Sequence, residues 1–225
     1  MKLKKIASLM LAGIMAVSML AACGSKTPDP NPGEGEGEGN TASGYSAMLG
    51  EKAADDLYKS DRDGIFTFAD NADDQKALEY VVSHEVDQND IKNIISGDYV
   101  NDRDNTFVKG LWTAFNAKAK INNGIYGGLK NTTHVQGSVN STRFAEFYVA
   151  NGDVDMDTVM SEIYEDVKDE FTSAMKDGKQ SDVVKVNYSY TVSVSVKNVP
   201  MTAFTDVNGS ANFIAVTVTR TAEIA

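Results

Sequence analysis

An uninterrupted two-residue alternation near the C-terminus constrains the fold of this chain more than any other feature. From position 184 to 197 every even residue is Val or Tyr, and every odd residue is Lys, Asn, Ser or Thr. Because successive side chains of a β-strand point to opposite faces, this pattern predicts one long strand with a buried and a solvated face. Ile214, Val216 and Val218 continue the alternation and predict a partner strand. Asn208-Gly209 predicts a two-residue hairpin turn before it.

The N-terminal half has the period of helices instead. Apolar residues recur there at three- and four-residue spacing, which predicts amphipathic helices. The expected helices are 45–60, one capped by Asp70 or Asn71, 88–96 ending at Gly97, and one from Asp104 or Asn105 to 122–124. A short apolar run, 65–68, separates the first two. We interpret the stripe containing Trp112 and Phe115 as core packing rather than a ligand platform.

The C-terminal half adds two further strands and one long helix to these elements. Segments 134–139 and 143–150 have strand character, and a helix is expected from Asp153 or Asp155 to a stop at Gly178. The predicted class is α+β: a helical N-terminal layer followed by an antiparallel sheet packed on one long helix. A long helix against a curved meander resembles the cystatin-like and nuclear-transport-factor-like folds. The resemblance is topological, without signature residues, and the extra N-terminal helices depart from it.

The first 23 residues have a different character from the rest of the chain. Three lysines at positions 2, 4 and 5 precede an apolar run, 6–20, which is short for a permanent membrane span and is typical of a secretory signal. Leu20-Ala21-Ala22-Cys23 then resembles the lipobox of bacterial lipoproteins. The resemblance implies that a diacylglyceryl group is attached to the thiol of Cys23, and that cleavage makes Cys23 the new N-terminus. It implies no biochemical activity.

A spacer separates the lipobox from the part of the chain that can form a core. Residues 24–43 contain three of the four prolines and a Gly-Glu alternation, a composition typical of an extended tether. All aromatic residues lie between Tyr45 and Phe213. We therefore predict a signal peptide over 1–22, a disordered tether over 23–43 and a single α+β domain over 44–225.

The net charge narrows the set of partners. The chain has a formal charge of -11, and removal of residues 1–22 takes away three lysines and no acid, which gives -14. Such a surface is not expected to bind nucleic acid, because neutralising phosphates requires clustered cations. Anionic headgroups would repel it, so the lipid on Cys23 is the expected contact with the membrane.

One acidic segment invites a calcium-binding interpretation. Asn151, Asp153, Asp155, Asp157 and Glu162 occupy positions one, three, five, seven and twelve of an EF-hand-like loop. Position six is Met156, where the loop needs a glycine for its sharp turn. We interpret the segment as the capped start of a helix, and the calcium alternative stays open. The shorter acidic segment 61–64 is interpreted as a turn.

Other candidate chemistry is weaker still. Ser173-Ala174-Met175-Lys176 matches the Ser-x-x-Lys string of penicillin-recognising enzymes, but it falls at the end of the predicted helix rather than at a start. His84 and His134 are the only histidines, and they lie on different predicted elements. We therefore expect no catalytic residue, no metal and no cofactor.

The leading hypothesis is a lipid-anchored extracytoplasmic surface protein whose folded part is a non-catalytic module that binds a small ligand or a partner. The alternative is a structural or adhesive cell-surface component that binds glycan or protein through the odd-numbered row from Lys185 to Lys197. A hydrolase acting on wall polymer is a third hypothesis.

Overall fold

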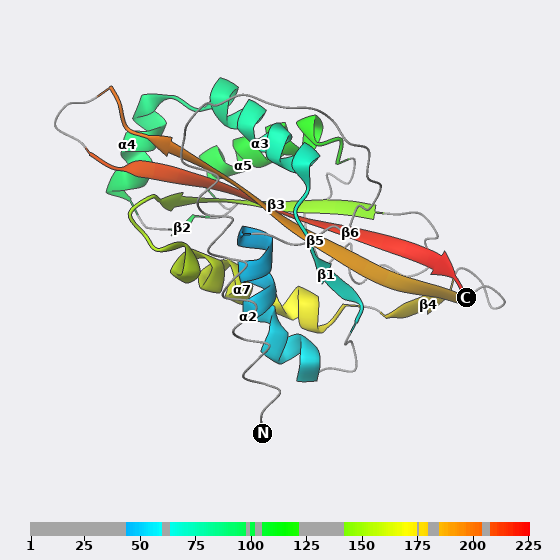
Figure 1. Cartoon of the computed structure of the whole chain (residues 1–225). Coiled ribbons are helices and arrows are strands. Elements are labelled where there is room, and N and C mark those ends of the chain that lie inside the picture. The colour runs from blue at the N-terminus through cyan, green and yellow to red at the C-terminus, as the bar shows by residue number, and fades with distance from the viewer. Residues whose placement is uncertain are drawn as a thin grey trace, which may run out of the picture.

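A six-stranded mixed sheet forms the centre of the part of the chain that the structure describes (Figure 1). The structure is a computed structural model, and it describes residues 44–59, 64–97, 100–101, 105–121, 142–174, 176–179, 185–203 and 208–225. The strands are β1 (Phe66–Phe68), β2 (Val100–Asn101), β3 (Thr142–Asn151), β4 (Asp177–Lys179), β5 (Lys185–Pro200) and β6 (Ser210–Ile224). Their order is β1-β5-β6-β3-β2, and β4 also pairs with β5. These pairings are antiparallel except that of β1 with β5, which is parallel.

The β5–β6 hairpin is the longest pairing and confirms the two predicted strands. Its register runs from Val186 opposite Ile224 to Pro200 opposite Ser210. The predicted alternation of buried and exposed side chains holds from 185 to 190. It fails at Ser193 and Ser195, which are only 3% and 2% exposed. The expected solvated face is buried there because helices pack on both sides of the sheet.

The predicted two-residue turn at Asn208-Gly209 is wrong. The strands stop pairing at Pro200 and Ser210, so the connection spans 201–209. Within it, the amide of Met201 donates to the carbonyl of Gly209 at 2.9 Å. Gly209 has a φ of 135°, which only glycine adopts readily, so it lies at the base of a longer loop rather than at the tip of a tight one.

Helices cover both faces of the sheet, which separates the helices of the N-terminal half (Figure 1). On one face lie α3 (Ala72–Glu85), α4 (Gln88–Ser96) and α5 (Thr106–Lys118). On the other face α2 (Tyr45–Lys59) packs against α7 (Met156–Thr172). The α+β class is therefore confirmed, but the expected antiparallel sheet is mixed, since β1 joins it in parallel, and α2 does not share a layer with α3, α4 and α5.

Ring contacts show how each helical layer meets the sheet. On the α2–α7 side, the ring of Phe66 lies 4.9 Å from that of Tyr190 on β5 and 5.2 Å from that of Phe171 on α7. On the opposite side, Phe115 of α5 lies 6.0 Å from Phe147 of β3. The indole of Trp112 also donates to the carbonyl of Ala145 at 2.6 Å. The predicted core stripe of α5 is thus confirmed.

Side-chain caps set the starts of the helices largely as predicted. Asn71 accepts hydrogen bonds from two amides in the first turn of α3, and Asn105 does the same for α5. Asp87 forms a reciprocal capping box with Asp90 at the start of α4. Asp155 precedes α7, as expected, but makes no capping bond through its side chain.

Two helices end earlier than the sequence predicts. α5 ends at Lys118 instead of 122–124, and Lys120 follows with a φ of 57°. α7 ends at Thr172 instead of Gly178, which lies in β4 and pairs with Val186. Residues 177–179 form β4 instead and pair with β5. The hydrogen bonds of this added strand stabilise the end of the chain segment more than a longer α7 would.

Several predictions lie outside the described residues. They are the signal peptide, the lipobox with Cys23, the tether to residue 43, the strand at 134–139, and residues 61–63 of the short acidic segment. Among the helices that are described, none combines the length and the apolar character needed to cross a bilayer.

Candidate functional site

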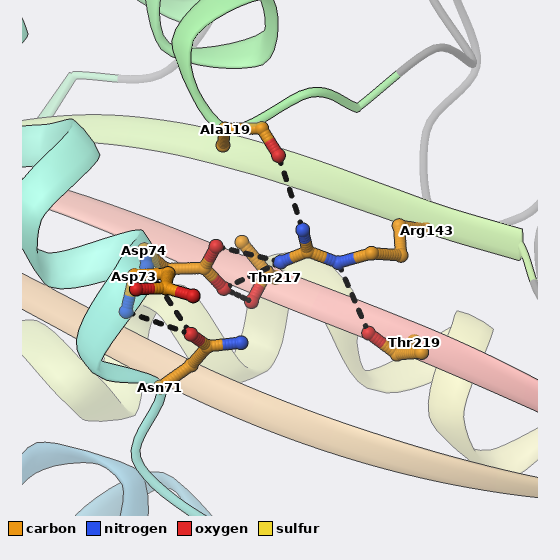
Figure 2. Close-up of polar contacts among 7 residues, drawn as sticks. All are labelled: Asn71, Asp73, Asp74, Ala119, Arg143, Thr217 and Thr219. Atoms are coloured by element: carbon orange, nitrogen blue, oxygen red, sulfur yellow. Dashed lines mark hydrogen bonds and ion pairs between the residues drawn. The ribbon is translucent and has the colours of Figure 1, made fainter.

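A buried polar network joins α3, the end of α5, and strands β3 and β6 (Figure 2). The side chain of Asp74 is 1% exposed, and its two carboxylate oxygens accept from Nη2 of Arg143 at 2.6 and 2.7 Å. The hydroxyl of Thr217 donates to the same carboxylate at 2.8 Å. Arg143 also donates through Nε to Thr219 at 3.3 Å and through Nη1 to the carbonyl of Ala119 at 3.1 Å.

The local sequence explains why these side chains meet. Asp74 lies in the first turn of α3, where Asn71 holds the amides of Asp73 and Asp74 at 3.0 and 3.2 Å. On the sheet, Arg143 pairs with Thr219, and Thr217 lies two residues further along the same face of β6. The cap of α3 and the register of β3 on β6 therefore bring an acid and a base together across 69 residues of sequence.

Sequence reasoning missed this pair. Asp73 and Asp74 both fall in the first turn of a helix, where the helix dipole favours acids, so the sequence gives the two the same role. The available signal was spacing: Asp74 precedes the buried residues Ala77, Leu78 and Val81 by three, four and seven positions, which puts it on the apolar stripe of α3. An acid on such a stripe requires a buried partner. Nothing local identifies Arg143 as that partner.

The geometry of the network is that of a structural ion pair. The carboxylate of Asp74 already accepts three hydrogen bonds, and the guanidinium of Arg143 donates hydrogen bonds to four oxygen atoms. Ser193 pairs with Thr217 in the register of the sheet, and its buried hydroxyl makes no hydrogen bond to the described residues. A nucleophilic hydroxyl is activated by an adjacent base, and none of the described groups is bonded to Ser193 in that way.

His84 lies far from this network. It is in the last turn of α3, ten residues after Asp74, which corresponds to about 15 Å along a helix. Its ring stacks on that of Tyr80 at 4.0 Å, and Nζ of Lys118 lies 3.4 Å from the centroid of Tyr80. Both faces of the exposed Tyr80 ring are thus occupied by its own neighbours. His134 lies outside the described residues.

The acidic segment at 151–162 runs from the last residue of β3 through a turn into the start of α7, as interpreted, although no side-chain cap is made by Asp155. Asn151 caps the turn by accepting from the amide of Asp153 at 3.0 Å, and it donates to the carbonyl of Ile95 at 3.1 Å. Asp157 forms an ion pair with Lys52 of α2 at 2.5 Å. Within the described ranges, no three His, Cys, Asp or Glu side chains are grouped so that they could hold a metal ion.

The Ser-x-x-Lys string follows α7 rather than opening a helix. Ser173 is exposed and is the residue directly after α7, and its hydroxyl donates back to the carbonyl of Asp169. In the penicillin-recognising enzymes the serine stands at a helix start, where amide donors face it. Met175 lies outside the described residues, so the string is only partly described.

A second polar cluster fastens α2 to α7. The hydroxyl of Tyr164 donates to the carboxylate of Asp56 at 3.0 Å, and Nζ of Lys168 lies 3.2 Å from the same carboxylate. Burial, followed by the bond to Asp56, raises the pKa of Tyr164 well above its ordinary value. The bond to Asp56 also raises the pKa of Lys168. These contacts stabilise the helix pair.

The odd-numbered row of β5 is divided between surface and core. Lys185, Asn187 and Ser189 are exposed, whereas Ser193 and Ser195 lie under the helices. An adhesive surface that uses the whole row from Lys185 to Lys197 is therefore wrong. The fully exposed residues of the row are those at its start, whereas Thr191 and Lys197 are half-buried.

The chain was compared with protein-family models, with characterised proteins and with solved structures, and none of them matches it.

Proposed function

We propose that this chain is a lipid-anchored extracytoplasmic surface protein whose folded part is a non-catalytic module that binds a small ligand or a partner. The observation that carries the proposal is the sequence Leu20-Ala21-Ala22-Cys23, placed directly after three lysines and a short apolar run. Two acyl chains hold a protein on a bilayer far more firmly than one, at about 0.8 kcal/mol per buried methylene.

The state of the buried acids and bases supports a non-catalytic role. The hydrogen-bonding groups of Asp74 and Arg143 are engaged with each other and with neighbouring oxygen atoms. His84 lies about 15 Å along α3 from Asp74. A general acid or base must reach a reacting group within hydrogen-bond distance.

The adhesive alternative has one observation in its favour. Lys185, Asn187 and Ser189 form an exposed polar strip along β5, beside Thr221 and Glu223 of β6 in register. A flat polar strip of this kind suits hydrogen bonding to a glycan or to a protein surface.

We also propose that β3, α7 and the β5–β6 hairpin are the part of the fold that resembles the cystatin-like and nuclear-transport-factor-like folds. The support is that α7 follows β3 directly and packs on the sheet, where the hydroxyl of Tyr148 on β3 donates to Asp166 of α7 at 2.7 Å. The layer of α3, α4 and α5 on the opposite face is additional to that unit.

Metabolic labelling with palmitate tests the anchor. The parent should incorporate label and sediment with membranes, whereas Cys23→Ser should do neither, because the thioether cannot form. Ser25→Ala, two residues beyond the lipobox, is the matched control and should behave as the parent. Label on Cys23→Ser, or its unchanged sedimentation with membranes, would refute the anchor.

Native mass spectrometry of protein purified from its own host tests the binding role. A retained ligand should appear as added mass that is lost on denaturation. For the adhesive alternative, replacing Lys185, Asn187 and Ser189 by Ala should reduce adhesion to cells or wall material. If that variant adheres as the parent does, the adhesive alternative fails.

A further inference from the structure

One stretch of the β5 edge is closed by side chains instead of by a strand. On the side away from β6, β4 pairs with residues 185–187 and β1 with residues 190–192. The backbone bonds on this side belong to even-numbered residues: the amide of Tyr190 donates to the carbonyl of Ile65, and the carbonyl of Val192 accepts from the amide of Ala69. Beyond Val192, none of the described strands pairs with this edge.

Helices α2 and α3 supply the next partners. The amide of Val194 donates to the hydroxyl of Ser46 at 2.9 Å. The side-chain amide of Gln75 then pairs with both backbone groups of Val196: Oε1 accepts from its amide at 3.2 Å, and Nε2 donates to its carbonyl at 3.1 Å. Gln75 therefore presents to the strand the same donor and acceptor as the peptide group of a neighbouring strand.

Helix α4 bonds the last residue of the edge and the start of the connection that follows it. Nε2 of Gln88 donates to the carbonyl of Pro200 at 3.3 Å. Its Oε1 accepts from the amides of Thr202 and Ala203 at 2.6 and 3.1 Å. Pro200 itself has no amide hydrogen to offer a further strand.

The sequence of this stretch would favour association with another strand if the edge of β5 were open. Residues 192–199 are Val-Ser-Val-Ser-Val-Lys-Asn-Val, rich in β-branched residues, with one charge and no proline. An open strand edge of such composition is a template for pairing with another strand. The most available complementary strand is the same segment of a second copy, because an edge with alternating outward donors and acceptors can pair with itself in antiparallel register.

We propose that Ser46, Gln75 and Gln88 keep the edge of β5 from Val194 to Pro200 closed against strand addition by a second copy of this chain. Glutamine suits the role because one uncharged side chain carries both a donor and an acceptor. The three side chains come from three helices, so their bonds to the edge depend on the packing of α2, α3 and α4 against the sheet.

The test compares two doubly substituted full-length chains. Gln75→Met with Gln88→Met keeps side-chain length and removes the edge bonds made by the two glutamines, leaving that of Ser46 in place. Lys76→Met with Asn89→Met adds the same two side chains at neighbouring exposed positions and is the matched control. By sedimentation velocity over a wide concentration range, the edge variant should form dimers or larger species, with at least a twofold higher average mass than the parent. The control should match the parent.

A proline separates strand addition from unspecific association. Val196→Pro removes an amide that points out of the sheet, which an edge strand tolerates. Added to the edge variant, it should return the average mass to that of the parent. The proposal is overturned if the edge variant keeps the mass of the parent, or if Val196→Pro leaves the association unchanged.

Hydrogen exchange gives a second measurement that does not depend on the double variant folding. In Gln75→Met alone, the amide of Val196 should exchange at least tenfold faster than in the parent. The amide of Tyr190, bonded to the backbone of Ile65, should be unaffected. Equal exchange of Val196 in both proteins would overturn the proposal.

Discussion

Asp73 and Asp74 are adjacent in the first turn of α3, yet they have different physical roles. The side chain of Asp73 is 91% exposed and forms a weak ion pair with Lys76 at 3.6 Å. The side chain of Asp74 is 1% exposed and is held by Arg143 and Thr217. Sequence reasoning gave both the same role, since the helix dipole favours either acid. Only the position of the helix on the sheet distinguishes them.

Asp74→Asn should therefore destabilise the protein far more than Asp73→Asn. Removing one partner of a buried ion pair costs about 3–5 kcal/mol, and the lower end applies because the side chain of Arg143 is 29% exposed. Asp73→Asn, in the same helical turn, should change the free energy of unfolding by less than about 0.5 kcal/mol. Urea unfolding measures both. Equal losses would mean that the pair contributes nothing beyond the helix dipole.

At the scale of elements, α2 packs on β1 at a small residue and is bound to α7 by polar residues. α2 buries an apolar stripe of Leu49, Ala53 and Leu57, as the sequence predicts. Gly50 lets α2 approach β1 closely, since a Cβ there would lie 2.9 Å from the ring of Phe68. Asp56 then holds Tyr164 and Lys168 of α7. The stripe is visible in the sequence, whereas the partner helix is not.

This contact predicts a loss of stability in alkali. The pKa values of Tyr164 and Lys168 are raised in the folded protein, so both groups keep their protons after those of the unfolded chain are lost. Their contribution is fully present below about pH 10, the ordinary tyrosine pKa, and is lost as the pH rises further. The free energy of unfolding should therefore fall steeply above that pH.

Tyr164→Phe should make that fall shallower. It removes one titrating group and one hydrogen bond, which costs about 1 kcal/mol at neutral pH. Tyr45→Phe, which removes an exposed hydroxyl at the start of α2, is the matched control and should keep the slope of the parent. Urea unfolding between pH 7 and 11 measures the slopes. A Tyr164→Phe slope as steep as that of the parent would contradict the role of this hydroxyl.

At the scale of the whole molecule, helices cover both faces of one sheet. This packing determines which polar residues of the sheet are exposed to solvent. Ser193 and Ser195 are buried under helices that precede them by about a hundred residues in the chain. The same packing puts Ser46, Gln75 and Gln88 at the edge of β5. Polar residues at regular sequence positions thus become surface, core or edge according to what packs on them.

The acidic segment 151–162 gives a prediction at this scale, because a bound calcium ion would stabilise the entire cooperative unit. Neither calcium nor a chelator should change the Tm. Oδ1 of Asn151 already accepts from the amide of Asp153, and a carboxylate oxygen of Asp157 already pairs with Nζ of Lys52, so both oxygens are engaged within the protein. Thermal melts with calcium and with chelator measure this. A rise of several degrees on adding calcium would favour the loop interpretation.

The sequence by itself determined the local features of this protein. The caps at Asn71 and Asn105, the apolar stripes and the alternation of β5 follow from interactions within a few residues, so a short window contains their causes. Only the tertiary structure decided the end of α7, the length of the β5–β6 connection, the pairing of Asp74 with Arg143 and the closing of the β5 edge. Those features depend on which distant surface each element buries, and the free energy of that burial outweighs the local preferences at the ends of the elements.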